Sequence, residues 1–281
     1  MLMYVYVLYL LHKRQQGVDE VKIAVYARKG GVNKTTATVN IAGILAQQGK
    51  RVLLIDSDAQ GNVAGSFGLN TNKLEYTLYD VLLNNTPAKQ AIINVADNID
   101  LLPSNYDMDN FEFDLGRSNK FNNPNVVLKY RLDDLEKDYD YVLVDTPPAL
   151  NTIVRNVLMY VDSILIPMLD EPYSVSGVVS LYREIEKLKE DNKRLEILGI
   201  FNVMVDSRTT LHKQLQDQLQ SWADSNDVYV FNTNIPKSIS FANATAYSAL
   251  PATLQEPYKS NKAVKAYYTP TNEIKERINN G

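Results

Sequence analysis

Residues able to hold a phosphate chain stand together near the start of the sequence, between an apolar, β-rich run and a helical pattern. The segment reads Lys29-Gly30-Gly31-Val32-Asn33-Lys34-Thr35-Thr36. Unpaired N–H groups at the start of a helix, together with the helix dipole, favour a polyphosphate at this position. Lys34 would reach the β- and γ-phosphates, and Thr35 would place its hydroxyl on Mg²⁺.

The segment departs from the general phosphate-loop pattern G-x-x-x-x-G-K-[ST] at both glycines. Arg28 occupies the first glycine position and Asn33 the second. We expect a positive φ at position 33, and asparagine is one of the few residues with a β-carbon that adopts one readily. Its side chain adds bulk beside the phosphates, so the pattern predicts nucleotide binding more firmly than turnover.

Acidic residues close two further apolar runs. Asp56 and Asp58 follow the run at residues 51–55, and Asp145 follows the run at residues 141–144 and precedes Thr146-Pro147-Pro148. Ligands of doubly wound sheets bind at the carboxyl ends of the strands. An acid at the end of a buried strand is the usual group that holds the Mg²⁺ water shell. Each acid taken alone could equally cap a helix or a turn.

The elements that must position these residues alternate along the chain from residue 21 onward. Short apolar runs followed by helical patterns predict an α/β fold, a doubly wound and mostly parallel sheet with helices on both faces. We expect strands at residues 21–26, 51–55, 99–102, 141–144, 163–167, 197–203 and 228–231. We expect helices at residues 35–48, 78–83, 126–137, 151–159, 175–192, 209–223 and 262–277. Residues 106–125 show no periodicity and are interpreted as a long irregular insertion.

Length and composition exclude several classes of protein and of site. The chain has 281 residues, a formal net charge of −4 and no cysteine, which excludes disulfide scaffolds, thiolate metal sites and iron–sulfur clusters and suits a reducing cytoplasm. The apolar run at residues 1–11 is too short to span a bilayer. We interpret residues 1–19 as an extension outside the core and residues 20–281 as a single phosphate-loop ATPase domain.

The ordered combination of these segments resembles the deviant Walker A group of P-loop NTPases, specifically the ParA-type plasmid and chromosome partition ATPases. The resemblance covers most of residues 21–278. The loop is similar to the family's K-G-G-V-G-K-T-T, the second segment to D-x-D-P-Q-G-N and the third to D-x-P-P, with Asn33 and Ala59 departing from them. Further matches follow in the same order at Pro167, Glu171, Gly177, Asp206-Ser207-Arg208-Thr209 and Ile235-Pro236.

The resemblance implies a Mg²⁺-dependent ATPase whose ATP-bound homodimer sandwiches the nucleotides. Lys29 would cross to the partner's ATP phosphates, although a loop lysine of this kind could also be simply exposed. Asp58 would position the attacking water, Asp56 and Asp145 would hold the Mg²⁺ shell, and Pro236 would lie near the adenine. ATP and Mg²⁺ are the implied cofactors.

The resemblance also implies DNA segregation. The ATP-bound dimer would bind DNA without sequence preference, and a centromere-binding, ParB-like partner would stimulate hydrolysis and release it, which predicts a cytoplasmic, nucleoid-associated protein. Family members often carry two basic residues after the Ile-Pro step, whereas this chain has Lys237 and then Ser240. Lys259, Lys262 and Lys265 are the other candidates, because their spacing could place them on one helical face, although a solvated face explains them as well.

Two other functions compete with partition. A MinD-like positioning ATPase would end in an amphipathic membrane helix, but residues 273–281 are mostly polar, so we expect no stable membrane association. Alternatively, Arg28 and Asn33 could make the chain a slowly hydrolysing or non-hydrolysing nucleotide-switched binding or regulatory module. Nitrogenase iron proteins share the lysine-rich loop but need cysteine ligands, which this chain lacks.

Overall fold

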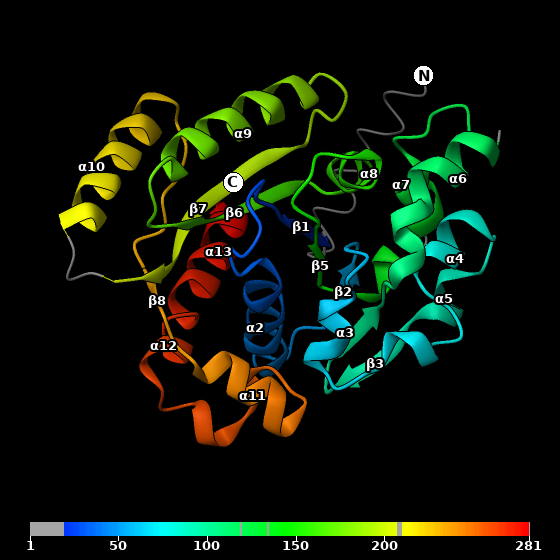
Figure 1. Ribbon diagram of the computed structural model, residues 1–281, viewed down its shortest axis with the longest axis horizontal. Helices are drawn as coiled ribbons and strands as arrows, with labels where there is room; N and C mark the ends of the chain where they lie inside the picture. Colours follow the sequence, from blue (N-terminus) through cyan, green and yellow to red (C-terminus); the bar gives the residue numbers. More distant parts are fainter. Residues whose placement is uncertain (1–19, 119, 134, 207–209, 281) are drawn as a thin grey trace.

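A sheet of eight strands forms the middle layer of the computed structural model, which describes residues 20–118, 120–133, 135–206 and 210–280 (Figure 1). Its strand order is β3-β4-β2-β5-β1-β6-β7-β8, and all pairs are parallel except β3 with β4. The strands are β1 Val21–Val25, β2 Val52–Asp56, β3 Ile93–Ala96, β4 Ile99–Leu102, β5 Tyr141–Asp145, β6 Ser163–Leu169, β7 Glu196–Val205 and β8 Ile235–Pro236. The predicted α/β fold, doubly wound and mostly parallel, is confirmed.

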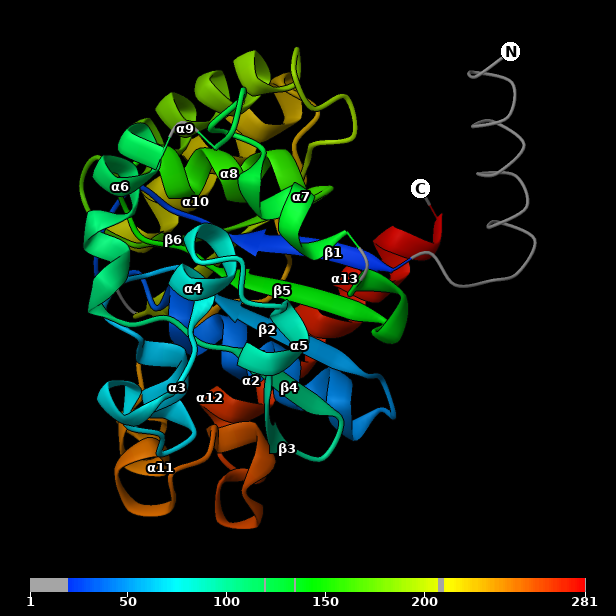
Figure 2. The ribbon, with the colours of Figure 1, turned by 90° about the vertical axis from the view of Figure 1, so that its right-hand side faces the viewer.

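Helices cover both faces of this sheet, as Figure 2 shows from the side. One layer contains α4 Leu78–Leu83, α5 Ala88–Ala91, α6 Phe111–Ser118, α7 Val127–Leu132, α8 Thr152–Tyr160, α9 Ser174–Leu188 and α10 Thr210–Ser225. The other contains α2 Lys34–Gln47, α3 Asn62–Ser66, α11 Ser240–Ser248, α12 Lys262–Lys265 and α13 Tyr268–Asn280. Short 3₁₀ helices occur at η1 Thr71–Lys73, η2 Tyr106–Asn110, η3 Glu136–Asp138, η4 Ala252–Leu254 and η5 Glu256–Tyr258.

The central strands are buried on both faces, which explains why they read as unbroken apolar runs. Every residue of β2, β5 and β6 is buried. β1 lies between β5 and β6, and β5 lies between β1 and β2. Because these strands are parallel, the loops after β1, β2 and β5 all leave the sheet at the same edge.

Several sequence predictions are wrong in detail. Residues 228–231 form no strand and make only an isolated bridge between Ile200 and Val230, while the edge strand β8 lies a few residues later. The expected irregular insertion contains η2 and the two-turn helix α6. The expected helix at residues 262–277 is interrupted between α12 and α13.

Other features went unrecognised for physical reasons. α11 is rich in alanine, serine and threonine and has a weak apolar stripe, so periodicity gave no signal. The interpretation of residues 1–19 as an extension falls outside the described residues. In the part of the chain that is described, no helix combines the length and the apolar character needed to cross a bilayer.

Candidate functional site

The loop between β1 and α2 has the conformation that its glycines and asparagine suggest. Gly31 has φ +74°. Asn33, directly before α2, has φ 54° and ψ 32°, so the expected positive φ at this position is confirmed. Asparagine tolerates this left-handed region better than other residues with a β-carbon. Among the described contacts, the Asn33 side chain makes no capping hydrogen bond to α2, so the first N–H groups of the helix have no side-chain cap.

Lys34 and Thr35 form the first turn of α2 and point toward the carboxyl ends of the strands. Lys34 is 9% exposed. Burial lowers the pKa of its ammonium group, and the nearby carboxylates of Asp145 and Asp58 oppose that shift. The Thr35 hydroxyl donates a hydrogen bond to Asp145 Oδ2 at 2.5 Å. The lysine and threonine of the loop therefore share one site with the acids predicted from distant segments.

Asp56 and Asp145 are adjacent residues of the sheet. They are register partners at the ends of β2 and β5, and Asp145 is also the partner of Val25 at the end of β1. Both are buried, at 0% and 1% exposure. Backbone N–H groups of Asp58 and Val63 each donate to an Asp56 carboxylate oxygen at 3.0 Å. These bonds fix the Asp56 carboxyl in place at the end of its strand.

Burial makes ionisation of this acidic pair costly. Burial is the largest cause that raises the pKa of Asp145 from 3.8 to about 7, against the Thr35 hydrogen bond and the charge of Lys34. Burial and the charge of Asp145 also raise the pKa of Asp56 well above its usual value, while the two backbone hydrogen bonds lower it. Two buried carboxyls that are hard to ionise beside one lysine suit a site completed by further positive charge.

These groups fit Mg²⁺ bound together with a polyphosphate. Among the described residues, no group of three or more acidic or histidine side chains could hold a metal ion by itself. Mg²⁺ is commonly bound through one or two carboxylates and takes its other ligands from phosphates and water. Asp56 and Asp145 are two carboxylates of this kind, and the Thr35 hydroxyl adds a third group beside Lys34.

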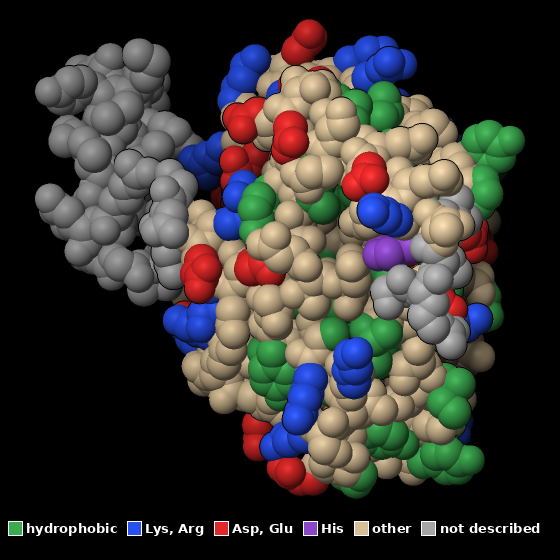
Figure 3. All heavy atoms as spheres, turned by 90° about the vertical axis from the view of Figure 1, so that its left-hand side faces the viewer, with side chains coloured by type: hydrophobic (Ala, Val, Ile, Leu, Met, Phe, Trp, Pro, Cys, Tyr) green, Lys and Arg blue, Asp and Glu red, His purple; other side chains and the backbone are tan. Residues whose placement is uncertain are grey.

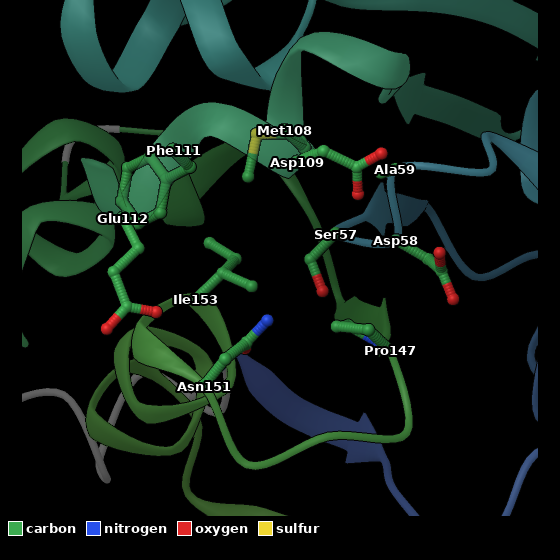
Figure 4. Close-up of a pocket in the computed structure, with 10 residues that line it drawn as sticks. All are labelled: Ser57, Asp58, Ala59, Met108, Asp109, Phe111, Glu112, Pro147, Asn151 and Ile153. Carbon is green, nitrogen blue, oxygen red and sulfur yellow. The ribbon is translucent and has the colours of Figure 1, made fainter. Parts of the chain in front are cut away.

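Asp58 lies at the rim of a cavity of about 110 Å³, drawn in Figure 4. It is partly exposed, and its Oδ1 accepts a hydrogen bond from the Gln60 N–H at 3.1 Å. The loops after β2 and β5 and the start of α8 form part of the wall. Met108 and Phe111 line the other side, so the first part of the expected irregular insertion shapes the site. This wall was not expected from the sequence, in which aromatic residues among acids at residues 111–114 are a signal that could have indicated it.

Lys29 and Arg28 lie on the other side of the loop and contact the segment that follows β6. Lys29 Nζ forms an ion pair with Glu171 Oε2, and both side chains are about half exposed. Arg28 Nη1 donates to Glu184 Oε1 at 2.7 Å and to Ser180 Oγ at 3.4 Å, both on α9. The arginine at the first glycine position therefore extends toward α9. A mainly apolar cavity of about 380 Å³ lies between the loop and the start of α9.

The remaining predicted residues lie away from this cluster. Pro236 pairs with Val205 at the β8 edge, and β6 and β7 separate β8 from β1. Lys237, Lys262 and Lys265 are exposed. The expectation that Lys259 shares a helical face with Lys262 and Lys265 is wrong, because Lys259 follows η5 and pairs with Glu256, whereas the other two lie on α12.

Several known proteins are similar to this chain in sequence. The model of a family described as an AAA domain matches residues 20–197. The chain is 33% identical to the chromosome partitioning protein ParA of Caulobacter vibrioides over 80% of its own length and 84% of that protein. It is 31% identical to the chromosome-partitioning ATPase Soj of Thermus thermophilus, covering 92% and 96% of the two chains.

A solved structure of similar fold contains a bound nucleotide. It is described as a cobyrinic acid a,c-diamide synthase of Mycobacterium smegmatis with an ATP analogue and magnesium. It aligns with a TM-score of 0.77 and 29% identity over 90% of this chain and 93% of that one.

The acidic pair predicts an unusual pH dependence of stability in the absence of nucleotide and Mg²⁺. Because the folded-state pKa of Asp145 is raised to about 7, the folded protein binds a proton that the unfolded chain has lost. Between about pH 4 and about pH 7 this term lowers the free energy of unfolding as pH rises. Urea titrations across this range should give a steeper fall for the wild type than for Asp145→Asn. Equal slopes would contradict the assignment.

Proposed function

The chain belongs to the ParA family of partition ATPases, and we propose that it is a Mg²⁺-dependent ATPase that segregates DNA as a nucleotide-switched dimer. The observation that carries the proposal is the meeting of Lys34, Thr35, Asp56 and Asp145 at the ends of neighbouring parallel strands. ATP and Mg²⁺ are the cofactors that this arrangement suits.

Each residue of the site has a separate role in the proposed binding of ATP. Lys34 neutralises charge on the β- and γ-phosphates, and residues 30–36 surround the phosphates with backbone N–H groups. Thr35 ligates the cation directly, and Asp56 and Asp145 hold its water shell. Pro236 lies beside the adenine. Bound Mg²⁺ supplies the positive charge that stabilises the phosphates during transfer.

Asp58 is the residue that we assign to orienting the attacking water. It lies next to Asp56, since its backbone N–H donates to Asp56 Oδ1, and its charge influences Lys34. It is also partly exposed at a cavity, whereas Asp56 and Asp145 are fully enclosed. A carboxylate that solvent reaches beside the phosphate site is the better candidate for contacting a water molecule.

Dimerisation would free Lys29 from its own chain. In the single chain its ammonium group pairs with Glu171, in a contact that both exposed side chains can leave at small cost. In the proposed ATP-bound dimer Lys29 instead contacts the phosphates bound by the partner, where a cation stabilises the transition state in trans. This exchange of partners makes dimer formation depend on the nucleotide.

We assign DNA binding to the surface around α11 and α12. On the face drawn in Figure 3, Lys and Arg side chains stand beside hydrophobic ones in the lower half, at the level where Figure 1 shows these helices. Lys237, Lys262 and Lys265 are exposed in this region, together with Ile239 and Tyr247. Phosphate contacts from such lysines give binding without sequence preference. A ParB-like partner would then stimulate hydrolysis and release the dimer from the nucleoid.

A nucleotide-switched module with little turnover is one alternative to this function. It was suggested by Arg28 and Asn33, yet Asn33 adopts the left-handed conformation of its position and Arg28 is bonded to α9. Both departures are thus compatible with the loop conformation, and the rate of hydrolysis separates the two functions.

The first prediction concerns Asp58. Asp58→Ala should lower Mg²⁺-dependent ATP turnover by about 100-fold while ATP still binds, because only the orientation of the water is lost. Phosphate release and nucleotide binding would be measured with and without nonspecific DNA. Asp109→Asn, at the rim of the same cavity, serves as the control and should turn over normally. If the wild type binds ATP tightly without turnover that Asp58→Ala removes, the chain is a binding module.

The second prediction concerns Lys29. With a slowly hydrolysed ATP analogue, light scattering should show the mass of the wild type doubling and that of Lys29→Ala unchanged, because the cross-dimer cation is missing. Lys89→Ala removes an exposed lysine on α5 and should dimerise like the wild type. A wild-type mass that does not respond to the analogue would rule out the dimer.

The third prediction concerns DNA. The double variant Lys262→Glu and Lys265→Glu should weaken DNA binding and flatten its dependence on log salt by about two units for each subunit that contacts the duplex, one per lost phosphate contact. Fluorescence anisotropy of a labelled duplex at several salt concentrations measures both. Lys89→Glu reverses one charge elsewhere and should leave the slope close to that of the wild type. An anisotropy titration in which the double variant binds as tightly as the wild type would place the DNA surface elsewhere.

A further inference from the structure

Thr253 in η4 is hydrogen-bonded to the phosphate-loop helix α2. Its N–H donates to Asn40 Oδ1 at 3.1 Å, and its hydroxyl donates to the Asn40 carbonyl at 3.2 Å. Its own carbonyl accepts from Gln47 Nε2 at 2.6 Å. Thr253 is 0% exposed and Asn40 is 2% exposed. All polar groups of one residue of the C-terminal region are therefore satisfied by α2, although the two segments lie more than 200 positions apart.

Gly43 makes this close contact possible. A β-carbon added at Gly43 would lie 2.5 Å from Thr253 Oγ1 and 3.1 Å from Leu254 Cγ. Real β-carbons do not approach other atoms that closely, so any side chain here would push η4 away from α2. The glycine is in the middle of a helix, where it weakens the helix by roughly 0.5–1 kcal/mol relative to alanine. Its position is explained by the approach of η4.

The other end of α2 is the nucleotide site. α2 begins at Lys34, and at 1.5 Å rise per residue Asn40 is only about 9 Å further along its axis. In between, the buried Thr38 donates to the Lys34 carbonyl at 3.0 Å and lies 3.5 Å from Asp145 Oδ1. A displacement of the first turn on binding phosphate would therefore reach Asn40 through one short, buried piece of helix.

η4 in turn holds the segment that carries the lysines. Gln255 Nε2 donates to the Ala244 carbonyl at 3.1 Å, which joins η4 to α11. Asn261 caps α12 and donates to Ser240 Oγ at 2.8 Å, which joins α12 to α11. Ala244, Ala252 and Val264 form a small apolar cluster of their own, separate from the two main cores. Figures 1 and 2 both show α11 beneath α2.

We propose that Asn40, Gly43 and Thr253 are positioning residues that couple the nucleotide state to the orientation of the lysine-bearing segment, residues 240–265. The inference rests on the nucleotide-switched DNA binding proposed above, and it names the residues that connect the nucleotide site to the lysines. None of the three residues contacts nucleotide or DNA in this scheme. They fix the segment to α2, so that movement of α2 reorients Lys262 and Lys265.

The experiment compares two threonines that each lose one buried hydroxyl. Thr253→Val removes the hydroxyl's bond to the Asn40 carbonyl, whereas Thr271→Val removes a bond of 2.7 Å to the Tyr267 carbonyl and breaks no hydrogen bond to α2. Thr253→Ser keeps the hydroxyl and should rescue. Hydrogen exchange of residues 240–265 is followed with and without a slowly hydrolysed ATP analogue, alongside affinities for the analogue and for a labelled duplex.

In the wild type, the analogue should change exchange across residues 240–265. In Thr253→Val this response should disappear while affinity for the analogue stays within about twofold, and the gain in DNA affinity that the analogue produces should shrink roughly fivefold, as expected for one lost hydrogen bond. Thr271→Val and Thr253→Ser should behave like the wild type.

Three results would overturn the proposal: a wild-type segment whose exchange ignores the analogue, a full response in Thr253→Val, or an equal loss in Thr271→Val. If Thr253→Val does not fold, Gln47→Ala breaks the third contact of Thr253, and Tyr268→Phe is its control because Tyr268 also bonds Gln47. A responding segment in a protein that binds no DNA would refute the DNA function and leave the coupling intact.

Discussion

The rest of the structure depends on two buried carboxyl groups at the ends of adjacent strands. Asp56 and Asp145 are register partners, and both are buried from bulk solvent. Their ionisation is costly without added positive charge, as the raised pKa values of both groups show. The site is therefore electrostatically incomplete with Lys34 alone. The proposed Mg²⁺, bound together with ATP, would complete it and would link the stability of this end of the sheet to the ligand.

The loop and helix around this pair connect it to two other parts of the molecule. α2 begins at the acids, with Thr35 bonded to Asp145, and ends against the C-terminal segment. On the other side the loop is tied to α9 by Arg28 and to the segment after β6 by Lys29. The loop and α2 thus connect the site both to the surface proposed for dimerisation and to the segment proposed for DNA binding. A change in charge at the phosphates can affect both.

The two helical layers contribute differently to the site. The layer with α2 and α3 contains the helix that follows the phosphate loop, and residues 28–31 of the loop are exposed, whereas the opposite layer supplies η2 and α6 as one wall of the cavity at Asp58. That wall carries the exposed acids Asp109 and Glu112 beside an apolar floor. The acid assigned to the water therefore lies at a cavity whose walls come from the loops after β2 and β5 and from η2 and α6 of the opposite layer.

The sequence by itself determined the fold class, the loop and the acids that meet it. These follow from local rules, because parallel buried strands are apolar runs and their following loops share one edge. Asn33 was correctly expected at a positive φ for the same local reason. Only the tertiary structure decided the contacts of Lys29 with Glu171 and of Thr253 with α2, the cavity wall from η2 and α6, and the break that separates Lys259 from α12. Such contacts join residues far apart in the chain and depend on how whole layers pack, which spacing along the sequence does not encode.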